Sequence, residues 1–446
     1  MKRTKIEKLL IFLFTFFIGL NVFAQLPDPA IVGYWENWYG TNFVKLKDID
    51  SRYNVITIAF ATPKTGTDYD MELVVPYTYS KAVYKSEISI LQNQGKKVIL
   101  SIGGQNHPVV LNSIAEKNTF VSSVNAIIDD FGFDGIDIDI EGTALEYSNI
   151  TIANPSDAKL VNMIDAIKEI LANHKTNHND EKLLLLMAPE AIYVQGALSP
   201  WENTWNKYKG AYLPIIEALR DDIDMVNVQL YNSGSMYGLD KVSGGEFSQS
   251  TADFIVAMTE AVIKGFTAES GIGVYSGLPA SKVGVGLPGC AGYGYTSPAV
   301  VRSAIDYLMG KGSKPGSYTL KKAGGYPDLL GMMVWSINSD KKCSPSYGYV
   351  NNWNKIFNGV VSTDHHITKE LEDELFYPNP VNSSIHFTSI PSGSVSILDL
   401  KGNEVLDIGV VTADSEVDLE NLTAGFYLLK LEDENGTVSY QKLLKQ

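Results

Sequence analysis

The sequence predicts an α/β fold, a (β/α)8 (TIM) barrel, followed by a small all-β sandwich domain at the C-terminal end. Short β-rich apolar runs alternate with longer amphipathic stretches over roughly 330 residues, which suits the length and periodicity of such a barrel. Eight runs of this kind occur before the pattern changes. The last part of the chain, about 70 residues, carries short β runs separated by Gly-Asn, Asn-Gly and Ser-Gly turns, as an antiparallel sandwich would.

The eight predicted strands are spread along the first part of the chain. They span residues 31–35, 54–60, 97–103, 135–141, 183–188, 224–231, 282–288 and 329–335. Amphipathic helices are expected between them, for example over 120–131, 157–174 and 297–309. Barrel enzymes carry their chemistry at the carboxyl ends of the strands, so residues near these ends are the first candidates for a functional site.

The run FGFDGIDIDIEG, residues 131–142, sets three carboxylates at alternate positions: Asp137, Asp139 and Glu141. Successive strand residues point to opposite faces, so these acids share one face and three isoleucines share the other. Each carboxylate raises the cost of ionising its neighbours, so at least one pKa in the group is expected to be raised. A raised pKa keeps a carboxylic acid protonated near neutral pH, ready to donate a proton.

An acidic alternation is also typical of a solvated sheet face. Three details favour chemistry here. Phe131, Phe133 and the isoleucines suit a strand that helices cover on one side, and Gly135 and Gly142 bracket it, as close packing or a sharp exit would require. Asp134 completes the spacing DxxDxDxE, which is far more specific than a pair of acids.

The chain resembles glycoside hydrolase family 18, the chitinases and their relatives, from about residue 31 to about residue 357. Asp134, Asp137, Asp139 and Glu141 match the family signature position by position. Four further segments match in the same order: SIGG at 101–104, MAPE at 187–190, QLYN at 229–232 and VWSIN at 334–338. The fold of that family is the barrel that the periodicity also predicts.

The resemblance implies a retaining mechanism in which the substrate supplies the nucleophile. Glu141 would protonate the leaving glycosidic oxygen, while the acetamido carbonyl of the sugar in the −1 subsite attacks the anomeric carbon and forms an oxazolinium ion. Asp139 would orient the acetamido N–H, Asp137 would exchange a proton with Asp139, and Tyr231 would donate its hydroxyl to the acetamido oxygen. Asp134 is out of phase with the other acids, and we interpret it as structural, holding the start of the strand.

Other residues near strand ends are expected to bind the sugar. Trp335 should form an apolar floor under the −1 sugar, although a tryptophan without the VWSIN match would be read as core. Met187 and Gln229 are expected to line the same subsite, with Tyr34 and Phe60 beneath it.

Two departures from the family pattern bear on activity. Asn232 stands where many relatives carry Asp, which removes one charge near the acid and leaves the pH optimum open. Only about 40 residues separate the last two predicted strands, so the additional α+β domain that deepens the cleft of some relatives is expected to be absent. We therefore expect an open groove and endo-acting cleavage. Trp201, Trp205 and Tyr208 could form sugar platforms on the plus side of the site, which would suit a linear polymer.

Composition and the N-terminal segment bear on partners and location. The formal net charge of −15 argues against a nucleic-acid or anionic-membrane partner, whereas a neutral polysaccharide remains compatible. Residues 1–24 read as a signal peptide: a basic start, an apolar stretch over 9–20 and a small-residue site ending at Ala24. The apolar stretch is short for a membrane span, so no span is expected in the mature protein.

Cysteine and histidine usage predicts no cofactor. Cys290 and Cys343 are the only cysteines, and in an exported protein they either bridge two loops or stay free. His174 and His178 stand at i and i+4, but their polar segment favours a helix end or loop, and no metal is assigned.

The final segment resembles the C-terminal sorting domain that some Bacteroidetes-type bacteria use for type IX secretion. YPNP at 377–380, LTAGFY at 422–427 and the terminal KLLKQ carry the likeness. A small carbohydrate-binding module is the alternative, but the segment has no tryptophan to stack on a sugar. The expected organisation is a signal peptide (1–24), a catalytic barrel (25–361), a linker (362–375) and a sorting domain (376–446).

The sequence thus predicts a secreted or cell-surface, monomeric chitinase that cleaves β-1,4-linked N-acetylglucosamine polymers and interacts with the type IX secretion machinery. An endo-β-N-acetylglucosaminidase acting on N-glycans is the alternative, because both activities need a 2-acetamido group. A non-catalytic chitin-binding protein on the same scaffold is a third possibility, since fold does not fix function. It would be expected to lack the acid that this chain retains.

Overall fold

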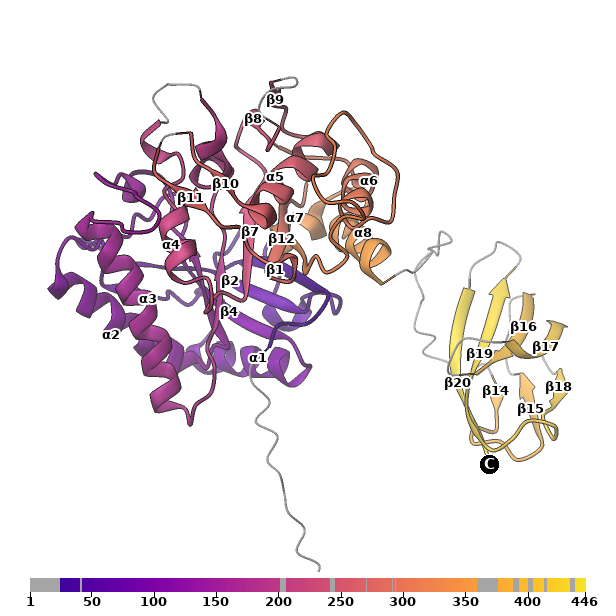
Figure 1. Cartoon of the computed structure of the whole chain (residues 1–446). Helices are drawn as coiled ribbons and strands as arrows, with labels where there is room; N and C mark the ends of the chain where they lie inside the picture. Colours follow the sequence, from indigo (N-terminus) through magenta and orange to yellow (C-terminus); the bar gives the residue numbers. More distant parts are fainter. Residues whose placement is uncertain are drawn as a thin grey trace, which may run out of the picture. The chain divides into compact units, whose positions relative to one another are not determined.

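The computed structural model divides the chain between Gly359 and Val360 into two compact units. Each unit is described by itself (Figure 1). The structure describes residues 25–40, 42–200, 206–240, 245–269, 271–290, 292, 294–358, 376–387, 393–399, 404–412, 415–433 and 438–446. The predicted signal peptide and the predicted linker lie outside these residues.

Eight parallel strands of the first unit close into a barrel, as predicted. Strand β1 pairs with β2 on one side and with β13 on the other, which closes the sheet in the order β1-β2-β4-β5-β6-β7-β12-β13. The strands are β1 (Ala30–Glu36), β2 (Val55–Pro63), β4 (Lys97–Gly103), β5 (Gly135–Asp139), β6 (Leu184–Met187), β7 (Met225–Gln229), β12 (Val283–Pro288) and β13 (Gly331–Trp335).

Two predicted strands end earlier than expected. β5 stops at Asp139 rather than Glu141, and β7 stops at Gln229 rather than Tyr231. After β5, the backbone N–H of Ile140 donates to the Tyr212 hydroxyl (2.7 Å) and its carbonyl accepts from the same hydroxyl (2.9 Å), so these groups do not pair with a strand. After β7, the backbone turns through Asn232, whose φ is 54°. Glu141 and Tyr231 therefore lie on the first turns after their strands.

Helices surround the barrel and form its outer layer (Figure 1). The predicted helices over 120–131, 157–174 and 297–309 are present as α2, α3 and α6, with α2 beginning six residues earlier because Ser113 caps it by accepting a bond from the Glu116 N–H. The helices are α1 (Lys81–Asn93), α2 (Ile114–Phe131), α3 (Ala158–Asn177), α4 (Leu213–Ala218), α5 (Ala252–Lys264), α6 (Pro298–Leu308), α7 (Ile337–Lys342) and α8 (Gly348–Phe357).

Short two-residue strands decorate the loops of the barrel. Strand β3 pairs antiparallel with the end of β2, and the other four form two small ribbons. They are β3 (Met71–Glu72), β8 (Met236–Tyr237), β9 (Glu246–Phe247), β10 (Phe266–Thr267) and β11 (Val274–Tyr275).

The barrel lumen is apolar at one level and polar nearer the carboxyl ends of the strands. Alternate residues such as Val32, Ile99 and Leu186 form a small buried cluster that is separate from the large core between strands and helices. Ser101 and Asn227 point into the same lumen from β4 and β7 and are fully buried. This mixture indicates a functional site in the lumen, because a purely structural barrel would fill the lumen with aliphatic side chains.

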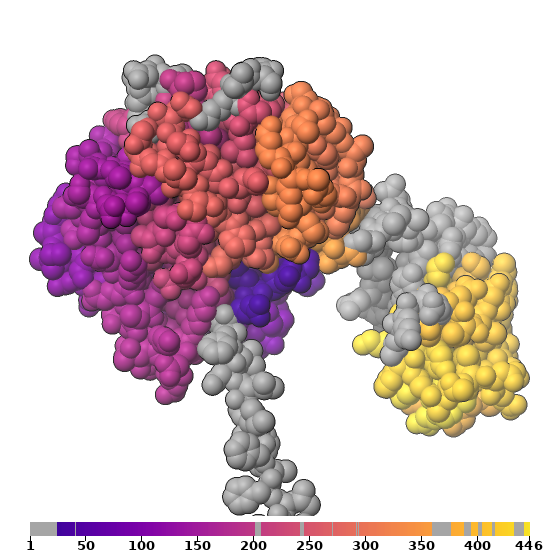
Figure 2. All heavy atoms as spheres, viewed as in Figure 1, coloured from indigo at the N-terminus to yellow at the C-terminus, as the bar shows by residue number. Residues whose placement is uncertain are grey.

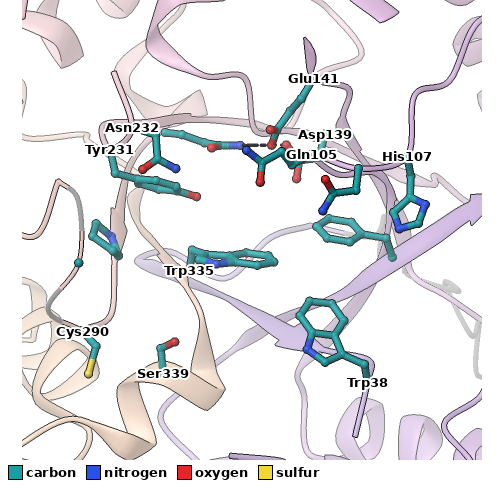
Figure 3. Close-up of a pocket in the computed structure, with 15 residues that line it drawn as sticks. Trp38, Gln105, His107, Asp139, Glu141, Tyr231, Asn232, Cys290, Trp335 and Ser339 are labelled. Carbon is teal, nitrogen blue, oxygen red and sulfur yellow. Dashed lines mark hydrogen bonds between the residues drawn. The ribbon is translucent and has the colours of Figure 1, made fainter. Parts of the chain in front are cut away.

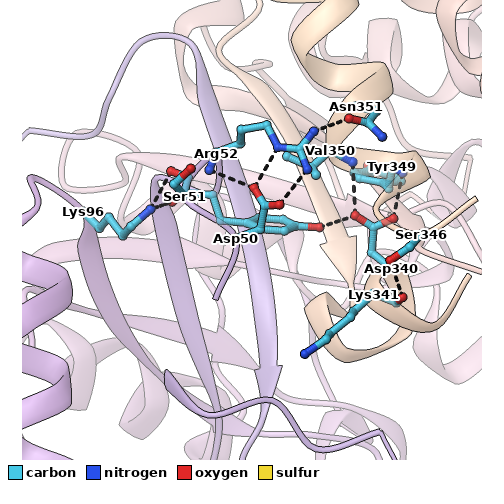
Figure 4. Close-up of polar contacts among 11 residues, drawn as sticks. Asp50, Ser51, Arg52, Lys96, Asp340, Lys341, Ser346, Tyr349, Val350 and Asn351 are labelled. Carbon is cyan, nitrogen blue, oxygen red and sulfur yellow. Dashed lines mark hydrogen bonds and ion pairs between the residues drawn. The ribbon is translucent and has the colours of Figure 1, made fainter. Parts of the chain in front are cut away.

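A buried carboxylate fixes the place where the two ends of the barrel meet. Asp340, in α7, accepts hydrogen bonds from the Tyr53 hydroxyl (2.6 Å) and from the backbone N–H groups of Tyr349 (2.7 Å) and Val350 (3.2 Å) (Figure 4). It therefore caps α8 while it holds the loop before β2. In Figure 2 the indigo early residues and the orange last helices adjoin on the surface, as this closure requires.

The second unit is all β, as predicted. Its two antiparallel sheets, β14-β15-β18 and β17-β16-β19-β20, share a core that includes Phe376, Ile397 and Leu429. The strands are β14 (Phe376–Tyr377), β15 (Ser384–Phe387), β16 (Gly393–Leu398), β17 (Glu404–Val411), β18 (Glu416–Asp418), β19 (Gly425–Asp433) and β20 (Val438–Lys445). Among the described residues of both units, no helix is long and apolar enough to cross a membrane.

Candidate active site

A cavity of about 560 Å³ lies at the carboxyl ends of the barrel strands, within the usual range for small-molecule sites. One side of its lining is aromatic and the other is polar, so it can stack against a sugar face while hydrogen-bonding the sugar's substituents. Figure 3 shows the polar groups facing the Trp335 indole across the cavity. The main lining residues are Trp38, Phe60 and Trp335 on the aromatic side and Asp139, Glu141, Gln229, Tyr231 and Asn232 on the polar side.

Asp137 lies beneath this cavity and is almost completely buried. Its Oδ2 accepts hydrogen bonds from the hydroxyls of Tyr34 and Ser101, both at 2.6 Å, while its Oδ1 is buried without a hydrogen-bond partner in the described part of the chain. Burial raises the pKa of Asp137 to about 6, although the two hydroxyl donors lower it by stabilising the charged form.

Asp139 is buried in contact with Glu141. Burial, and then the negative charges of Glu141 and Asp137, hold the pKa of Asp139 well above its usual value. A protonated Asp139 can donate to Glu141, and the two carboxyl groups are hydrogen-bonded. The predicted rise of a pKa within the acidic run is therefore confirmed, and its largest cause is burial rather than the neighbouring charges.

The amide of Gln229 holds both carboxyl groups in place from the neighbouring β7 strand. Its Nε2 donates to Asp139 Oδ1 (2.9 Å), Glu141 Oε1 (3.1 Å) and the Ala188 carbonyl (2.9 Å). Since the lone N–H₂ group is shared among three acceptors, the side chain is fixed in one orientation. Gln229 thus lines the cavity, as expected, and also positions the acid.

Glu190 is a further acidic residue at the site that the sequence interpretation did not assign. It ends the MAPE segment and its carboxyl group hydrogen-bonds to that of Glu141. Burial, and then the charge of Glu141, raises the pKa of Glu190 to about 7. The Tyr193 hydroxyl donates to Glu190 Oε1 (3.2 Å) and accepts from the Gly142 N–H (3.0 Å), which ties the two segments together. The sequence did carry a signal for this residue. Glu190 lies three residues after Met187, at the end of a barrel strand, where functional residues are expected.

Tyr231 and Asn232 line the polar side of the cavity. Burial, and then the charges of Asp139 and Glu141, raises the pKa of Tyr231 well above its usual value, so its hydroxyl stays protonated and can donate. Asn232 is exposed. Its neutral side chain adds no charge beside Glu141.

Trp335 forms the aromatic side of the cavity together with Phe60. Their rings stack with centroids 5.7 Å apart and planes inclined by 16°. Tyr34 packs against Trp335 from below (5.5 Å) while its hydroxyl bonds Asp137. The expected positions of Trp335, Phe60 and Tyr34 agree with this arrangement.

The structure does not bring Met187 into the site, contrary to our expectation. Leu184 and Leu186 of β6, and Ala188 just after the strand, belong to the small cluster in the lumen. Met187 therefore faces the surrounding helices and is buried in the large core. Tyr208 is also unsuited to the role of an open sugar platform, because its side chain is buried. Trp201 and Trp205 lie outside the described residues.

Asp134 has the structural role that was expected, and its partners are now visible. Its Oδ2 accepts from the Val98 N–H (2.7 Å) and from Gln92 Nε2 (3.0 Å), and Lys97 lies 3.7 Å from its Oδ1. These contacts tie the start of β5 to β4 and α1, away from the cavity.

Comparison with known proteins identifies the family of the first unit. Residues 30–300 match the family model for glycosyl hydrolases family 18. The chain belongs to this family. Chitinase Chi52 of Paenibacillus xylanexedens and Chitinase D of Niallia circulans are each 38% identical over 70% of this chain. The chain spans 60% of the length of each of these relatives.

A solved structure shares the fold of this family 18 barrel. The family GH18 chitinase from Chromobacterium violaceum superposes with a TM-score of 0.65 at 31% identity, covering 75% of this chain and 85% of the other. Trp335 lies beyond the residues matched by the family model, so its place in the site rests on the three-dimensional structure.

The second unit also has a family of its own. Residues 375–446 match the secretion system C-terminal sorting domain, which confirms the resemblance to the type IX sorting domain. Such a domain supports export to the cell surface or beyond it.

A disulfide bond joins Cys290 to Cys343, with Cα atoms 5.5 Å apart. Cys290 lines the cavity after β12, and Cys343 directly follows α7, the helix that comes after Trp335. Of the two possibilities left open by the sequence, the bridge between loops is the one found. It connects one wall of the cavity to the segment that carries the aromatic floor.

Proposed function

We propose that this protein is a secreted chitinase that hydrolyses β-1,4-linked N-acetylglucosamine polymers with retention of the anomeric configuration. One observation carries the mechanism: among the described residues that line the cavity, Asp139 and Glu141 are the only carboxylates, and they are hydrogen-bonded to each other. Glycosidases with a protein nucleophile or base set their two carboxyl groups roughly 5–9.5 Å apart, on either side of the sugar. Because Asp139 and Glu141 are in direct contact, a sugar cannot lie between their carboxyl groups. This contact supports a mechanism in which the substrate supplies the nucleophile.

In the first step Glu141 acts as general acid. Its proton passes to the glycosidic oxygen, the bond from that oxygen to the anomeric carbon breaks, and the acetamido carbonyl oxygen bonds to the same carbon. The product is an oxazolinium ion. The hydrogen bond from Gln229 supports this role, because it fixes the Glu141 carboxyl group at the cavity wall.

In the second step Glu141, now a carboxylate, takes a proton from water. The hydroxide bonds to the anomeric carbon, the ring bond to the acetamido oxygen breaks, and the amide is restored. Two displacements at one carbon give retention. Glu141 regains its proton, so the cycle balances.

The buried acids would serve the acetamido group. The raised pKa of Asp139 favours its protonated form in the free protein, and that proton can pass to Asp137 when Asp139 turns toward the acetamido N–H. As a carboxylate it would accept the N–H bond and stabilise the positive charge of the oxazolinium ion. The Tyr231 hydroxyl, which keeps its proton, would donate to the acetamido oxygen.

Trp335 and Phe60 would support the distorted −1 sugar by stacking. From Trp335 an aromatic track leads outward over the loops that follow β1 and β3: Trp38 lies 6.3 Å from the Trp335 ring, and Tyr39 lies 5.0 Å from Tyr77. Tyr77 is 79% exposed and Tyr39 55%. Such a track supports a linear polymer as substrate.

An open groove supports endo cleavage. Between β12 and β13 the described chain contains α6 and loops, without an inserted sheet that would wall the cleft. A chain could therefore enter along its length. Export through a signal peptide at residues 1–24 and the C-terminal sorting domain would bring the enzyme to polymeric chitin.

Hydrolysis of chitin oligomers of increasing length, with product anomers followed by NMR, tests the proposal. The β-anomer should appear first, and internal bonds should be cut from the first turnovers. The Glu141→Gln variant keeps the shape but lacks the proton, so kcat should fall at least about 10²-fold while oligomer binding persists. Inversion, or equal hydrolysis of glucose oligomers that lack the acetamido group, would refute the mechanism.

The same assay separates the proposed substrate from N-linked glycans. A glycoprotein substrate should be cleaved far more slowly than chitin oligomers. Release of intact glycans at a comparable kcat/KM would instead identify an endo-β-N-acetylglucosaminidase.

A further inference from the structure

Two histidines at the end of helix α3 face each other on the surface of the barrel unit. His174 lies in the last turn, His178 is the C-cap, and their rings stack with centroids 4.2 Å apart and planes inclined by 17°. Of the two alternatives expected from the sequence, a helix end or a loop, the helix end is the one found. The i, i+4 spacing places both imidazoles on one helix face, the arrangement in which paired histidines chelate a metal ion.

A carboxylate from another helix completes the cluster. Asp129 lies near the end of α2, and its Oδ1 is within hydrogen-bonding distance, 3.0 Å, of Nε2 of His178. One ligand atom from each of Asp129, His174 and His178 can be chosen so that all lie within 4.8 Å of one another. Figure 1 shows α2 and α3 lying side by side, which brings positions 129 and 174 together although 45 residues separate them. The sequence alone gives no sign that Asp129 lies beside the two histidines.

The spacing of these atoms suits a small tetrahedral cation. Ligand atoms about 2.0–2.1 Å from a zinc ion lie roughly 3.3 Å from one another, close to the distance between His178 Nε2 and Asp129 Oδ1. The other two distances are at most 4.8 Å, so the His174 ring would need to move closer to the ion. Its Nδ1 is buried and has no hydrogen-bond partner among the described residues, so the ring has bonding capacity to spare.

The surrounding charges favour a cation as well. Glu181 lies close enough to His174 to interact with it electrostatically. The negative charges of Glu181 and Asp129 together would balance the two positive charges of a divalent ion. The cluster also sits at the C-terminal ends of α2 and α3, where the helix dipoles are negative.

We propose that Asp129, His174 and His178 form a surface site for a divalent transition-metal ion of the zinc type, with water in the remaining position. Two imidazoles and one carboxylate suit zinc, nickel or copper, whereas magnesium and calcium prefer all-oxygen ligands. The bound ion would join the ends of α2 and α3, because its ligands come from both.

The location of this cluster indicates that a bound ion would stabilise the barrel and take no part in catalysis. α2 ends just before β5 begins and α3 ends before β6 begins, so the cluster lies at the opposite end of the barrel from the cavity. Conserved features at that end of a barrel serve stability, not chemistry. The proposal therefore stands or falls independently of the proposed hydrolase activity.

Thermal unfolding of the mature full-length protein, first stripped with a chelator, tests the site. Zinc at about 100 times its Kd should raise Tm by roughly 3–6 °C, and calorimetric titration should show one tight ion per chain. Calcium and magnesium at the same concentration should leave Tm unchanged. Hydrolysis of oligomers at 25 °C should differ less than twofold with and without zinc.

Substitution decides whether these three residues hold the ion. His174→Gln and His178→Gln should each abolish the zinc-dependent rise in Tm, and Asp129→Asn should weaken zinc binding at least tenfold. His386→Gln is the matched control, since His386 faces a single carboxylate, Glu416, at 3.7 Å in the other unit. An unchanged rise in the His174→Gln/His178→Gln double variant, or no binding to the wild type at millimolar zinc, would overturn the proposal.

Discussion

The hydroxyl of Tyr34 donates a 2.6 Å hydrogen bond to Oδ2 of Asp137 across the barrel lumen, between residues 103 positions apart. The same tyrosine ring packs under Trp335, so one side chain links the buried acid to the aromatic floor of the site. The bond stabilises the charged form of Asp137 against the cost of burial, which alone raises its pKa. Tyr34 therefore helps to set the charge at the base of the acidic run.

Replacing Tyr34 by phenylalanine should destabilise the protein more at high pH than at low pH. Asp137 has a pKa of about 6, so below pH 5 the lost bond is one to a neutral carboxyl group and costs about 1 kcal/mol. Above pH 7 it is a bond to a carboxylate and costs about 1.5–3 kcal/mol. Urea unfolding at pH 5 and pH 8 measures the difference. Tyr349→Phe, which loses a bond to the Met333 carbonyl, should show no such pH dependence.

Glu190→Gln should stabilise the protein at alkaline pH. The folded-state pKa of Glu190, about 7, lies above the unfolded value near 4.5, so its contribution favours folding at low pH and is lost as pH rises from about 4.5 through 7. Glutamine does not titrate. The free energy of unfolding of the variant should therefore rise relative to that of the wild type as pH rises. Above pH 8 the relative gain should be about 3 kcal/mol, since each unit of pKa difference corresponds to 1.36 kcal/mol. Parallel curves of unfolding free energy against pH for the two proteins would contradict this assignment.

Trp38→Ala should impair activity on long substrates and spare short ones. Trp38 is 45% exposed beside Trp335, and each stacking contact is worth about 0.5–1.5 kcal/mol. KM for polymer or hexamer should rise roughly 2–10-fold, with little change for substrates too short to reach Trp38. Phe426→Ala, which removes an exposed aromatic from the other unit, is the control. Equal losses on all chain lengths would argue against the aromatic track.

Asp340→Ala should destabilise the barrel by at least about 3 kcal/mol. The change leaves the Tyr53 hydroxyl and the N–H groups of Tyr349 and Val350 without their acceptor in a buried place, and each such group costs about 1–3 kcal/mol. Guanidinium unfolding of the purified protein measures the loss. Asp165→Ala, at an exposed position of α3, should change stability by less than about 0.5 kcal/mol.

Much of the candidate site could be predicted because local rules fixed it. The alternation of Asp137, Asp139 and Glu141 follows from strand geometry, and motif spacing brought Tyr231 and Trp335 into consideration. Met187 shows the limit of such reasoning: a shift of one residue along a strand exchanges the lumen for the helix layer. The sequence pattern around β6 is apolar on both faces, so it carried no signal of which face is which.

What the sequence determined by itself is the barrel, its family and the acids on one strand, because periodicity and spacing are properties of neighbouring residues. Only the tertiary structure decided that Glu190 bonds to Glu141, that Gln229 holds two carboxyl groups and that Asp129 meets two histidines. Each of these contacts joins residues at least 45 positions apart, and their distance is set by how strands and helices pack. Side-chain pKa values follow the same rule, since burial, their largest cause here, exists only in the folded chain.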